Sequence, residues 1–197
     1  MPPRKRAAHA GRPRDTSIDD RVLAATRELL VELGWDGLSI RLVAARAGVS
    51  RSSLNRRWQS KAELVLHAIL GASPDLSPFE GTDRHGWISW VVRGSSELFS
   101  RPDMKAAVPG LMRALKENGQ LRRQMWADFT GPAVRLFAVD SEATETEAAD
   151  AELEARALLA MAAGAALFLT TVADDDDSAE ILHRVESMLT SVAGTQR

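Results

Sequence analysis

The sequence predicts an all-α fold. Apolar residues recur at helical spacing in stretches rich in Ala, Leu, Arg and Glu. No stretch shows the sustained alternation of β-branched and polar residues that is typical of strands. Gly and Pro separate the helical stretches, and the 197 residues are 45% apolar, enough to bury a substantial core.

The expected helices form two groups. Three compact helices lie within 19–57, and a connecting helix runs from Ser60 to about Ala72. The longer helices are expected at 82–100, 103–117, 119–138, 146–172 and 178–193. We therefore divide the chain into a basic disordered arm over 1–16, a first domain over 17–62 and a larger helical domain over 63–197.

The charge of the chain is distributed unevenly. Residues 1–70 carry 13 Lys+Arg and 7 Asp+Glu, whereas the remaining residues carry 12 and 20. A basic segment joined to an acidic one indicates a module that binds polyanions, attached to a second module. The sequence has no Cys, which excludes disulfides, thiolate metal sites and a catalytic cysteine. We expect a cytoplasmic protein without a secretory signal, because its first residues lack an apolar segment.

The first helix is expected to bury a single apolar stripe, made of Val22, Ala25, Leu29, Leu30 and Leu33. Ser39 is a suitable N-cap for the second helix, Gly48 supplies a sharp turn, and Val49 fills the core. Ser50 then caps a short third helix. Residues 39–57 thus predict a helix, a tight turn with Gly and a second helix, the geometry that presents a helix to the DNA major groove.

The third helix places donor-rich side chains outward. Leu54 and Trp58, four residues apart, are expected to face the core. The outward residues are Arg51, Ser52, Ser53, Asn55 and Arg56. Arg can bind a guanine edge and Asn an adenine edge, while Ser suits phosphates. A plain solvated face is the alternative for an isolated Arg/Ser run, but the preceding turn at 47–50 favours DNA binding.

Residues 38–50, followed by Leu54, 56–58 and 60–64, resemble the DNA-binding domain of TetR-family repressors. Spacing and residue types agree with that domain over residues 19 to about 70, and the first helix, ending at 33–34, fits it as well. Beyond residue 75, only the size and the helical character are similar. The resemblance implies a homodimer that binds a palindromic operator of double-stranded DNA and leaves it when a small molecule enters the C-terminal domain.

The resemblance also implies roles for individual residues. It implies base or phosphate contacts for Arg41, Arg51, Ser52, Ser53 and Asn55, and a phosphate contact for Lys61 at the start of the connecting helix, where the helix dipole favours an anion. The family usually has Tyr at the position of Asn55. The packing of that ring against the DNA backbone is therefore absent here, which indicates an unusual operator or a lower affinity.

The N-terminal arm carries Arg4, Arg6, Arg12 and Arg14. One interpretation is a solubilising tail. The other is an extension that follows phosphates or the minor groove, as basic arms of other helix-turn-helix proteins do. We expect the arm to add affinity rather than specificity.

Large side chains in the second domain predict a ligand pocket. The expected lining residues are Trp87, Trp90, Val91, Gly94, Met112, Met125, Trp126 and Phe129. Gly94 leaves a notch in its helical stripe, and indoles with thioethers suit an apolar or aromatic ligand. The alternative for each residue is ordinary core packing.

The last two helices predict a dimer interface. Residues 157–173 are uncharged, yet they are too few and too Ala-rich for a membrane span. Paired with the final helix across a two-fold axis, they would form a four-helix interface. The expected interface residues are Met161, Gly164, Phe168, Leu182, Val185 and Leu189. An intramolecular core is the alternative.

No catalytic or metal-binding pattern stands out. The run 174–177 is four contiguous Asp residues without the spacing of a calcium loop, and the four His residues are scattered. We expect no catalytic residue, no metal and no cofactor. The predicted function is therefore a ligand-released transcriptional repressor, with a ligand-independent architectural DNA binder or a small helical enzyme as alternatives.

Overall fold

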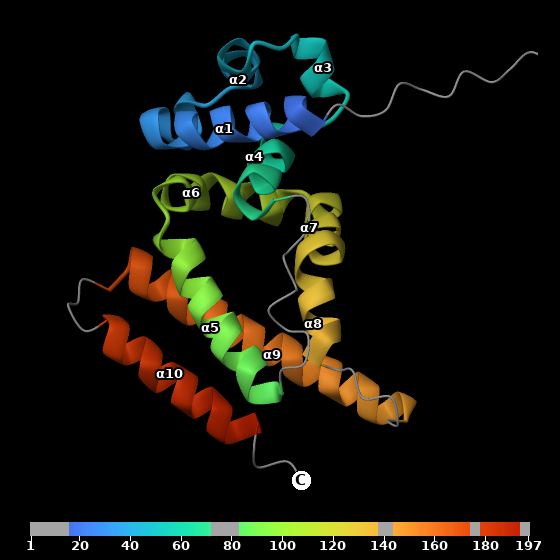
Figure 1. The fold of residues 1–197 in the computed structure, drawn as a ribbon, viewed down its shortest axis with the longest axis vertical. Coiled ribbons are helices and arrows are strands. Elements are labelled where there is room, and N and C mark those ends of the chain that lie inside the picture. The colour runs from blue at the N-terminus through green and yellow to red at the C-terminus, as the bar shows by residue number, and fades with distance from the viewer. Residues whose placement is uncertain (1–15, 72–82, 138–143, 174–177, 194–197) are drawn as a thin grey trace, which may run out of the picture.

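The computed structural model describes residues 16–71, 83–137, 144–173 and 178–193. Within these ranges every regular element is a helix, so the all-α prediction is confirmed (Figure 1). The Arg residues of the N-terminal arm, the run 174–177 and the segment 72–82 lie outside the described residues.

The N-terminal group consists of four helices, α1 (Thr16–Gly37), α2 (Ile40–Ala47), α3 (Arg51–Asn55) and α4 (Lys61–Leu70). Figure 1 shows α2 and α3 on one side of α1 at one end of the molecule, with α4 on the other side of α1, next to α6. The helical path of α1 is interrupted at Gly34, whose φ of 68° lies in the left-handed region. The predicted break after Leu33 is thus present, and one further turn follows it. Helix α3 ends at Asn55, two residues before the predicted end.

The second group consists of longer helices. They are α5 (Arg84–Ser100), α6 (Pro102–Glu117), α7 (Gly119–Met125), α8 (Gly131–Phe137), α9 (Glu145–Thr171) and α10 (Ser178–Ala193). The single helix expected over 119–138 is divided by a π-helical turn, η2 (Trp126–Thr130). Helix α9 begins with a capping box in which the side chains of Thr144 and Glu147 each accept a hydrogen bond from the other's backbone N–H.

The first hydrophobic core lies beneath the N-terminal helices and includes part of α6. Leu30, Val43 and Leu54 are at most 1% exposed in this core. Met104 and Leu111 of α6 belong to the same cluster. Helix α6 therefore completes the core of the N-terminal group, although α5 lies between them in the sequence.

The prediction that Leu33 is buried is wrong, since it is 47% exposed. The chain turns at Gly34, and the ring of Trp35 packs against the first core instead. The prediction assumes that α1 continues regularly through this point, and the left-handed Gly34 breaks that continuation.

The second core lies between α5, α8, α9 and α10. Trp87, Ile88 and Val91 of α5 are buried in it, and Leu158 of α9 is 2% exposed. Figure 1 shows α5 lying across α9, with α10 alongside. A third, smaller cluster joins Leu66 of α4 to the α7–η2 segment. Helix α4 therefore packs on both groups of helices.

Trp35 and Gly110 form a close contact between the groups. A Cβ atom at Gly110 would lie 1.9 Å from Cδ2 of Trp35, so the indole occupies the space that any side chain would need. The ammonium of Lys61 lies 4.6 Å from the centre of the same ring. Helix α6 continues through Pro109 immediately before this contact.

One helix in the described ranges, α9, is long and apolar enough by length and composition to cross a membrane. The core helix of a soluble protein meets the same criterion.

Gly110 and Gly94 provide a matched pair of helix substitutions. We expect Gly110→Ala to lower the free energy of unfolding by about 1–3 kcal/mol, because the added methyl group overpacks against Trp35. A Cβ atom at Gly94 would meet no neighbouring atom within 4 Å, so Gly94→Ala is expected to raise the free energy of unfolding by up to about 1 kcal/mol. Chemical denaturation measures both. Equal effects would contradict the close contact between Gly110 and Trp35.

Candidate DNA-binding surface and ligand cavity

The turn between α2 and α3 is fixed by its caps. The Ser39 hydroxyl accepts a hydrogen bond from the Leu42 N–H at 3.3 Å, and the Ser50 hydroxyl accepts one from the Ser53 N–H at 3.2 Å. Gly48 adopts φ 66° and ends α2. The three capping predictions are confirmed, and together they set the direction of the short helix α3.

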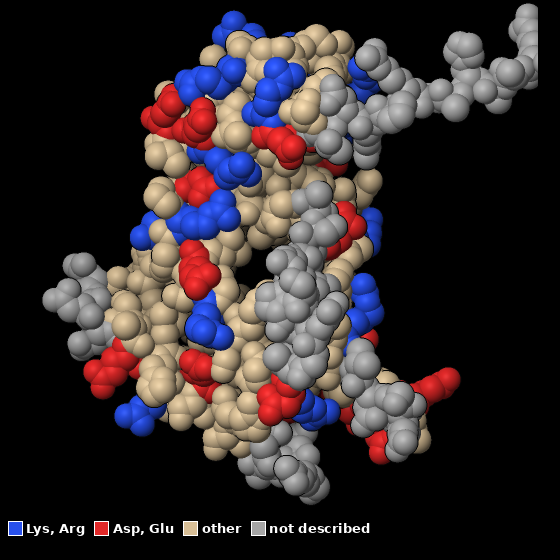
Figure 2. Space-filling view, in the orientation of Figure 1, with Lys and Arg blue, Asp and Glu red and all other residues tan. Residues whose placement is uncertain are grey.

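Helix α3 is anchored by its inner face. Leu54 is 1% exposed and Trp58, just beyond the helix, is 6% exposed. On the opposite side, Arg51, Ser52, Asn55 and Arg56 are exposed. Figure 2 shows Lys and Arg side chains across this end of the molecule, over α2 and α3. The helix, held by its buried face, thus presents Arg and Asn side chains, whose N–H donors suit the edges of bases.

Ser53 and Arg57 lie on the inner edge of this surface. The Ser53 hydroxyl accepts a hydrogen bond from Arg57 Nη1 at 3.0 Å, and Arg57 Nε donates to Asp19 of α1 at 2.5 Å. Ser53 is only half-buried. Arg57 thus ties α3 to the start of α1, a role that the sequence did not reveal.

Arg41 and Lys61 flank α3 in different ways. Arg41 is exposed on α2. The ammonium of Lys61 instead turns inward and donates to the carbonyl oxygens of Trp35, at 2.9 Å, and Leu38, at 3.2 Å. Burial lowers the pKa of Lys61, and the charge of Asp36 partly opposes that shift. In this arrangement Lys61 caps the end of α1.

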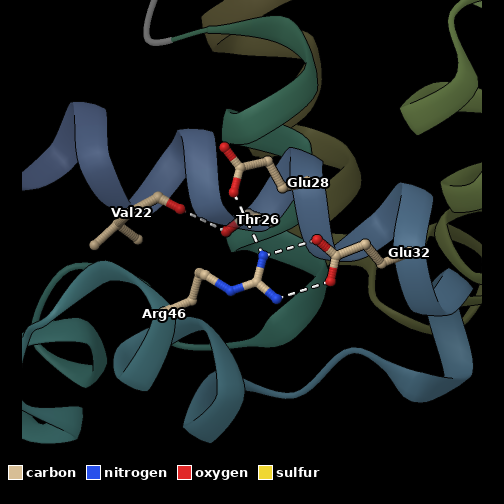
Figure 3. A network of polar contacts seen from close by, with 5 residues as sticks. All are labelled: Val22, Thr26, Glu28, Glu32 and Arg46. Carbon is tan, nitrogen blue, oxygen red and sulfur yellow. Dashed lines mark hydrogen bonds and ion pairs between the residues drawn. The ribbon is translucent and has the colours of Figure 1, made fainter.

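An ion-pair network holds α2 against α1 (Figure 3). Two guanidinium nitrogens of Arg46 donate to the carboxylate of Glu32, at 2.8 and 2.7 Å, and one lies 3.5 Å from Glu28. The hydrogen bonds from Arg46 lower the pKa of Glu32, and the same contacts raise the pKa of Arg46. Arg46 is therefore compensated, and Arg41, Arg51 and Arg56 carry the exposed charge of the surface.

A cavity of about 610 Å³ lies between α4, α5, α6 and the α7–α8 segment. Figure 1 shows these helices framing the middle of the molecule, and Figure 2 shows the surface hollowed there. Six of the predicted pocket residues line it, namely Trp90, Val91, Gly94, Met112, Met125 and Phe129. The side chain that Gly94 lacks leaves open space beside its backbone.

Trp87 and Trp126 are not among the residues that line the cavity. The Trp87 indole N–H donates to the Ala133 carbonyl at 2.9 Å, and its ring packs edge-on against Phe137 in the second core. The Trp126 ring lies 4.6 Å from the guanidinium carbon of Arg156. The prediction for both indoles depends on large side chains on helices of the second domain, which does not distinguish a cavity wall from a core.

Sequence reasoning missed the cavity residues contributed by α4. Leu66, Ile69 and Leu70 line it, although the sequence predicts α4 only as a connecting helix. The apolar run in α4 was the available signal, but its partner helices could not be identified from the sequence.

The outer faces of α9 and α10 expose large apolar side chains. Met161 is 48% and Phe168 56% exposed, and Gly164 is exposed between them. Further exposed apolar residues that the sequence did not predict are Leu153, Val172, Ile181, Met188 and Val192. Several large apolar side chains exposed on two neighbouring helices are typical of a protein interface.

Leu189 does not lie on this outer face. It is 6% exposed and belongs to the second core, and Leu182 and Val185 pack against that core while remaining partly accessible. Helix α10 turns its 182/185/189 side towards α5, so the outer stripe consists of Ile181, Met188 and Val192. Periodicity located an apolar face on α10 but did not separate its inner side from its outer side.

A family model described as "Bacterial regulatory proteins, tetR family" matches residues 22–68. The uncharacterized HTH-type transcriptional regulator YdeS of Bacillus subtilis is 33% identical over 72 residues, which are 36% of each chain. The uncharacterized regulator Rv1556 of Mycobacterium tuberculosis is 48% identical over 58 residues, 29% of this chain and 27% of the relative. The chain thus matches only about a third of the length of these curated relatives.

Solved structures resemble the chain over most of its length. GusR of Salmonella enterica aligns with a TM-score of 0.58 at 19% identity, over 90% of this chain and 95% of that one. NalD of Pseudomonas aeruginosa, described as the secondary repressor of the MexAB-OprM multidrug efflux pump, aligns with a TM-score of 0.53 at 15% identity, over 90% and 97%. At such identities the similarity shows the fold alone.

The fold and the capped turn define a helix-turn-helix protein with an attached helical domain. Its matches among curated proteins are helix-turn-helix transcriptional regulators. Residues 22–68 match the family model of the TetR regulators, in agreement with the resemblance of the N-terminal domain. In the part of the chain that the structure describes, no group of three or more His, Asp or Glu side chains is arranged to hold a metal ion.

The Arg46 network predicts a pH-dependent contribution to stability. Arg46 lowers the pKa of Glu32 in the folded state, so the stabilisation is present above the unfolded pKa of Glu32 and is lost as the pH falls through the lower folded pKa. We expect Glu32→Gln to destabilise the protein at neutral pH, and the difference from wild type to shrink near pH ~3.

Urea denaturation at the two pH values measures this effect. Glu117→Gln, at an exposed position without an ion pair among the described contacts, is the control and should show no such trend. A Glu32→Gln effect of equal size at both pH values would contradict a role of the carboxylate charge.

Proposed function

We propose that this protein is a homodimeric transcriptional repressor that binds a palindromic DNA operator and leaves it when an apolar or aromatic molecule occupies the cavity. The observation that carries the proposal is the outward face of α3. Arg51 and Asn55 stand exposed on a helix whose other side is fixed in the core by Leu54 and Trp58. We infer a cytoplasmic regulator without catalytic activity or cofactor.

In this proposal α3 enters the major groove. Arg51 binds a guanine edge and Asn55 an adenine edge or a phosphate, while Ser52, Ser53 and Arg56 contact the backbone. Arg41 approaches a phosphate from α2. The N-terminus of α4 offers backbone N–H groups to another phosphate. Lys61, whose ammonium is bound to the carbonyl oxygens of Trp35 and Leu38, adds a positive charge near that end of the helix. Arg4, Arg6, Arg12 and Arg14 of the arm add electrostatic affinity.

The apolar outer faces of α9 and α10 support a dimer. Two helices from each protomer, joined across a two-fold axis, would bury Met161, Phe168 and Met188 and bring Gly164 close to the partner. Dimerisation also supplies the second recognition helix that a palindrome requires, one DNA turn away from the first.

The position of the cavity supports release by a ligand. Ile69, Met104 and Leu111 line it and also belong to the core beneath α1. A molecule that enters therefore contacts residues on which the orientation of the helix-turn-helix depends. A preference of a few kcal/mol for an altered spacing of the two recognition helices is enough to shift the dimer away from DNA.

Binding of the purified protein to the DNA upstream of its own gene tests the recognition surface. We expect Arg51→Ala to weaken this binding by about 1–3 kcal/mol, because a bidentate base contact is lost. Fluorescence anisotropy, titrated against salt and against scrambled DNA of equal length, measures the loss. Arg113→Ala, an exposed change on α6, is the matched control and should bind as wild type does.

Equal affinity for both DNAs with a steep salt dependence would indicate an architectural DNA binder instead of a sequence-specific regulator. Unchanged discrimination in Arg51→Ala would show that this residue of α3 does not read the DNA sequence.

A charge placed on the outer face of α9 tests the dimer. We expect Phe168→Glu to convert the protein to monomers, because two carboxylates would be buried at the two-fold interface. Analytical ultracentrifugation measures the mass. Val31→Glu changes a side chain of α1 that is similarly exposed, at 57%, and should leave the dimer intact. If the Phe168→Glu variant remains dimeric, the dimer interface lies elsewhere on the protein.

A further inference from the structure

The wall of the cavity is mainly apolar and contains very few charges. It includes the rings of Trp90, Phe99 and Phe129 and the thioethers of Met104, Met112 and Met125. Its charged lining residues are Glu97, near the end of α5, and Arg101, directly after that helix. The balance between these two groups decides which charge an apolar ligand can carry.

The positive charge of Arg101 is already compensated. Its guanidinium makes two hydrogen bonds to the Asp103 carboxylate, at 3.1 and 2.5 Å, and a third to the Ile69 carbonyl at 3.1 Å. The Asp103 side chain is only 8% exposed. Since a buried carboxylate needs its partner, Arg101 is held by Asp103 and is not available to bind an anion in the cavity.

The negative charge of Glu97 is not compensated in this way. Among the residues that the structure describes, the Glu97 side chain takes part in no hydrogen bond or ion pair. The two Arg residues one helical turn away from it are both engaged elsewhere. Arg93 donates to the Ser89 carbonyl at 3.3 Å, and Arg101 is bound to Asp103. The i,i+4 pairs that would normally neutralise a helix-surface Glu are therefore not formed.

Glu97 stands at the rim of the cavity. It also borders a smaller cavity of about 290 Å³ between α5 and α10, and its side chain is exposed. An apolar body placed among the aromatic rings would thus have its outer end near this carboxylate. The electron-rich faces of those rings add a second attraction for a cation.

We propose that the ligand of the cavity is an apolar cation, of a shape that packs against aromatic rings, whose charge is bound at the rim by Glu97. This inference rests on the proposed function and specifies its ligand class. The apolar part of the molecule supplies most of the binding free energy, and Glu97 discriminates between cations and anions of the same shape.

Two probes of nearly the same shape and opposite charge test this proposal. Tetraphenylphosphonium and tetraphenylborate are titrated into the full-length protein by isothermal titration calorimetry. The quantity to compare is the ratio of their dissociation constants, borate over phosphonium, in each variant. This comparison between variants cancels the intrinsic difference in hydration between the two ions.

We expect Glu97→Gln to lower that ratio about tenfold, because it removes an attraction to the cation and a repulsion of the anion. Glu97→Asp keeps the charge and should keep most of the ratio. Glu117→Gln, which removes an exposed charge on a residue that does not line the cavity, should leave the ratio unchanged. Gly94→Leu, which fills open space in the cavity, should weaken both probes.

The outcomes separate the ligand class from the wider function. Binding of both probes with a ratio that Glu97→Gln leaves unchanged would overturn the cation proposal and leave the cavity as a ligand site. A ratio that favours the borate because of Arg101, and inverts in Arg101→Gln, would also overturn it. If neither probe binds, the cation proposal and the proposed response to apolar ligands both fail.

Discussion

The contact between Trp35 and Gly110 constrains the rest of the structure. The N-terminal helices do not enclose their own core, and α6 completes it with Met104, Ala107 and Leu111. Helix α6 can approach closely only because residue 110 has no side chain where the indole lies. The same indole is covered by the Lys61 ammonium at the start of α4. One aromatic ring thus joins α1, α4 and α6.

This junction links the cavity to the proposed DNA-binding surface by packing alone. Leu66 and Ile69 of α4 contact the cavity on one side, while Leu64 and Val65 of the same helix belong to the core beneath α1. Because a close-packed interior transmits a change in volume, the proposed ligand would act on α4 directly. No long chain of polar contacts is needed to connect the two sites.

Predictions from the sequence were correct for features that depend on neighbouring residues. They were wrong for features that depend on which helices pack together. The caps at Ser39 and Ser50 and the turn at Gly48 follow from residues within three or four positions, and the structure has all three. Trp87 and Leu189 have the same periodicity as cavity or interface residues, but the packing of α5 and α10 places both in a core. The inward turn of Lys61 likewise depends on a carbonyl 26 residues away.

The basic character of the N-terminal segment divides into two roles that its composition does not distinguish. Arg46 and Arg57 are paired with carboxylates of α1 and hold α2 and α3 in place. Arg41, Arg51 and Arg56 remain exposed. The carboxylates of α1 therefore decide which guanidinium groups are structural and which can meet a phosphate or a base. Removing a carboxylate such as Glu32 would add net positive charge to this surface, yet it would loosen the helix that orients the reading residues. If this surface binds DNA as proposed, affinity and the geometry of recognition place opposite requirements on the same acidic side chains.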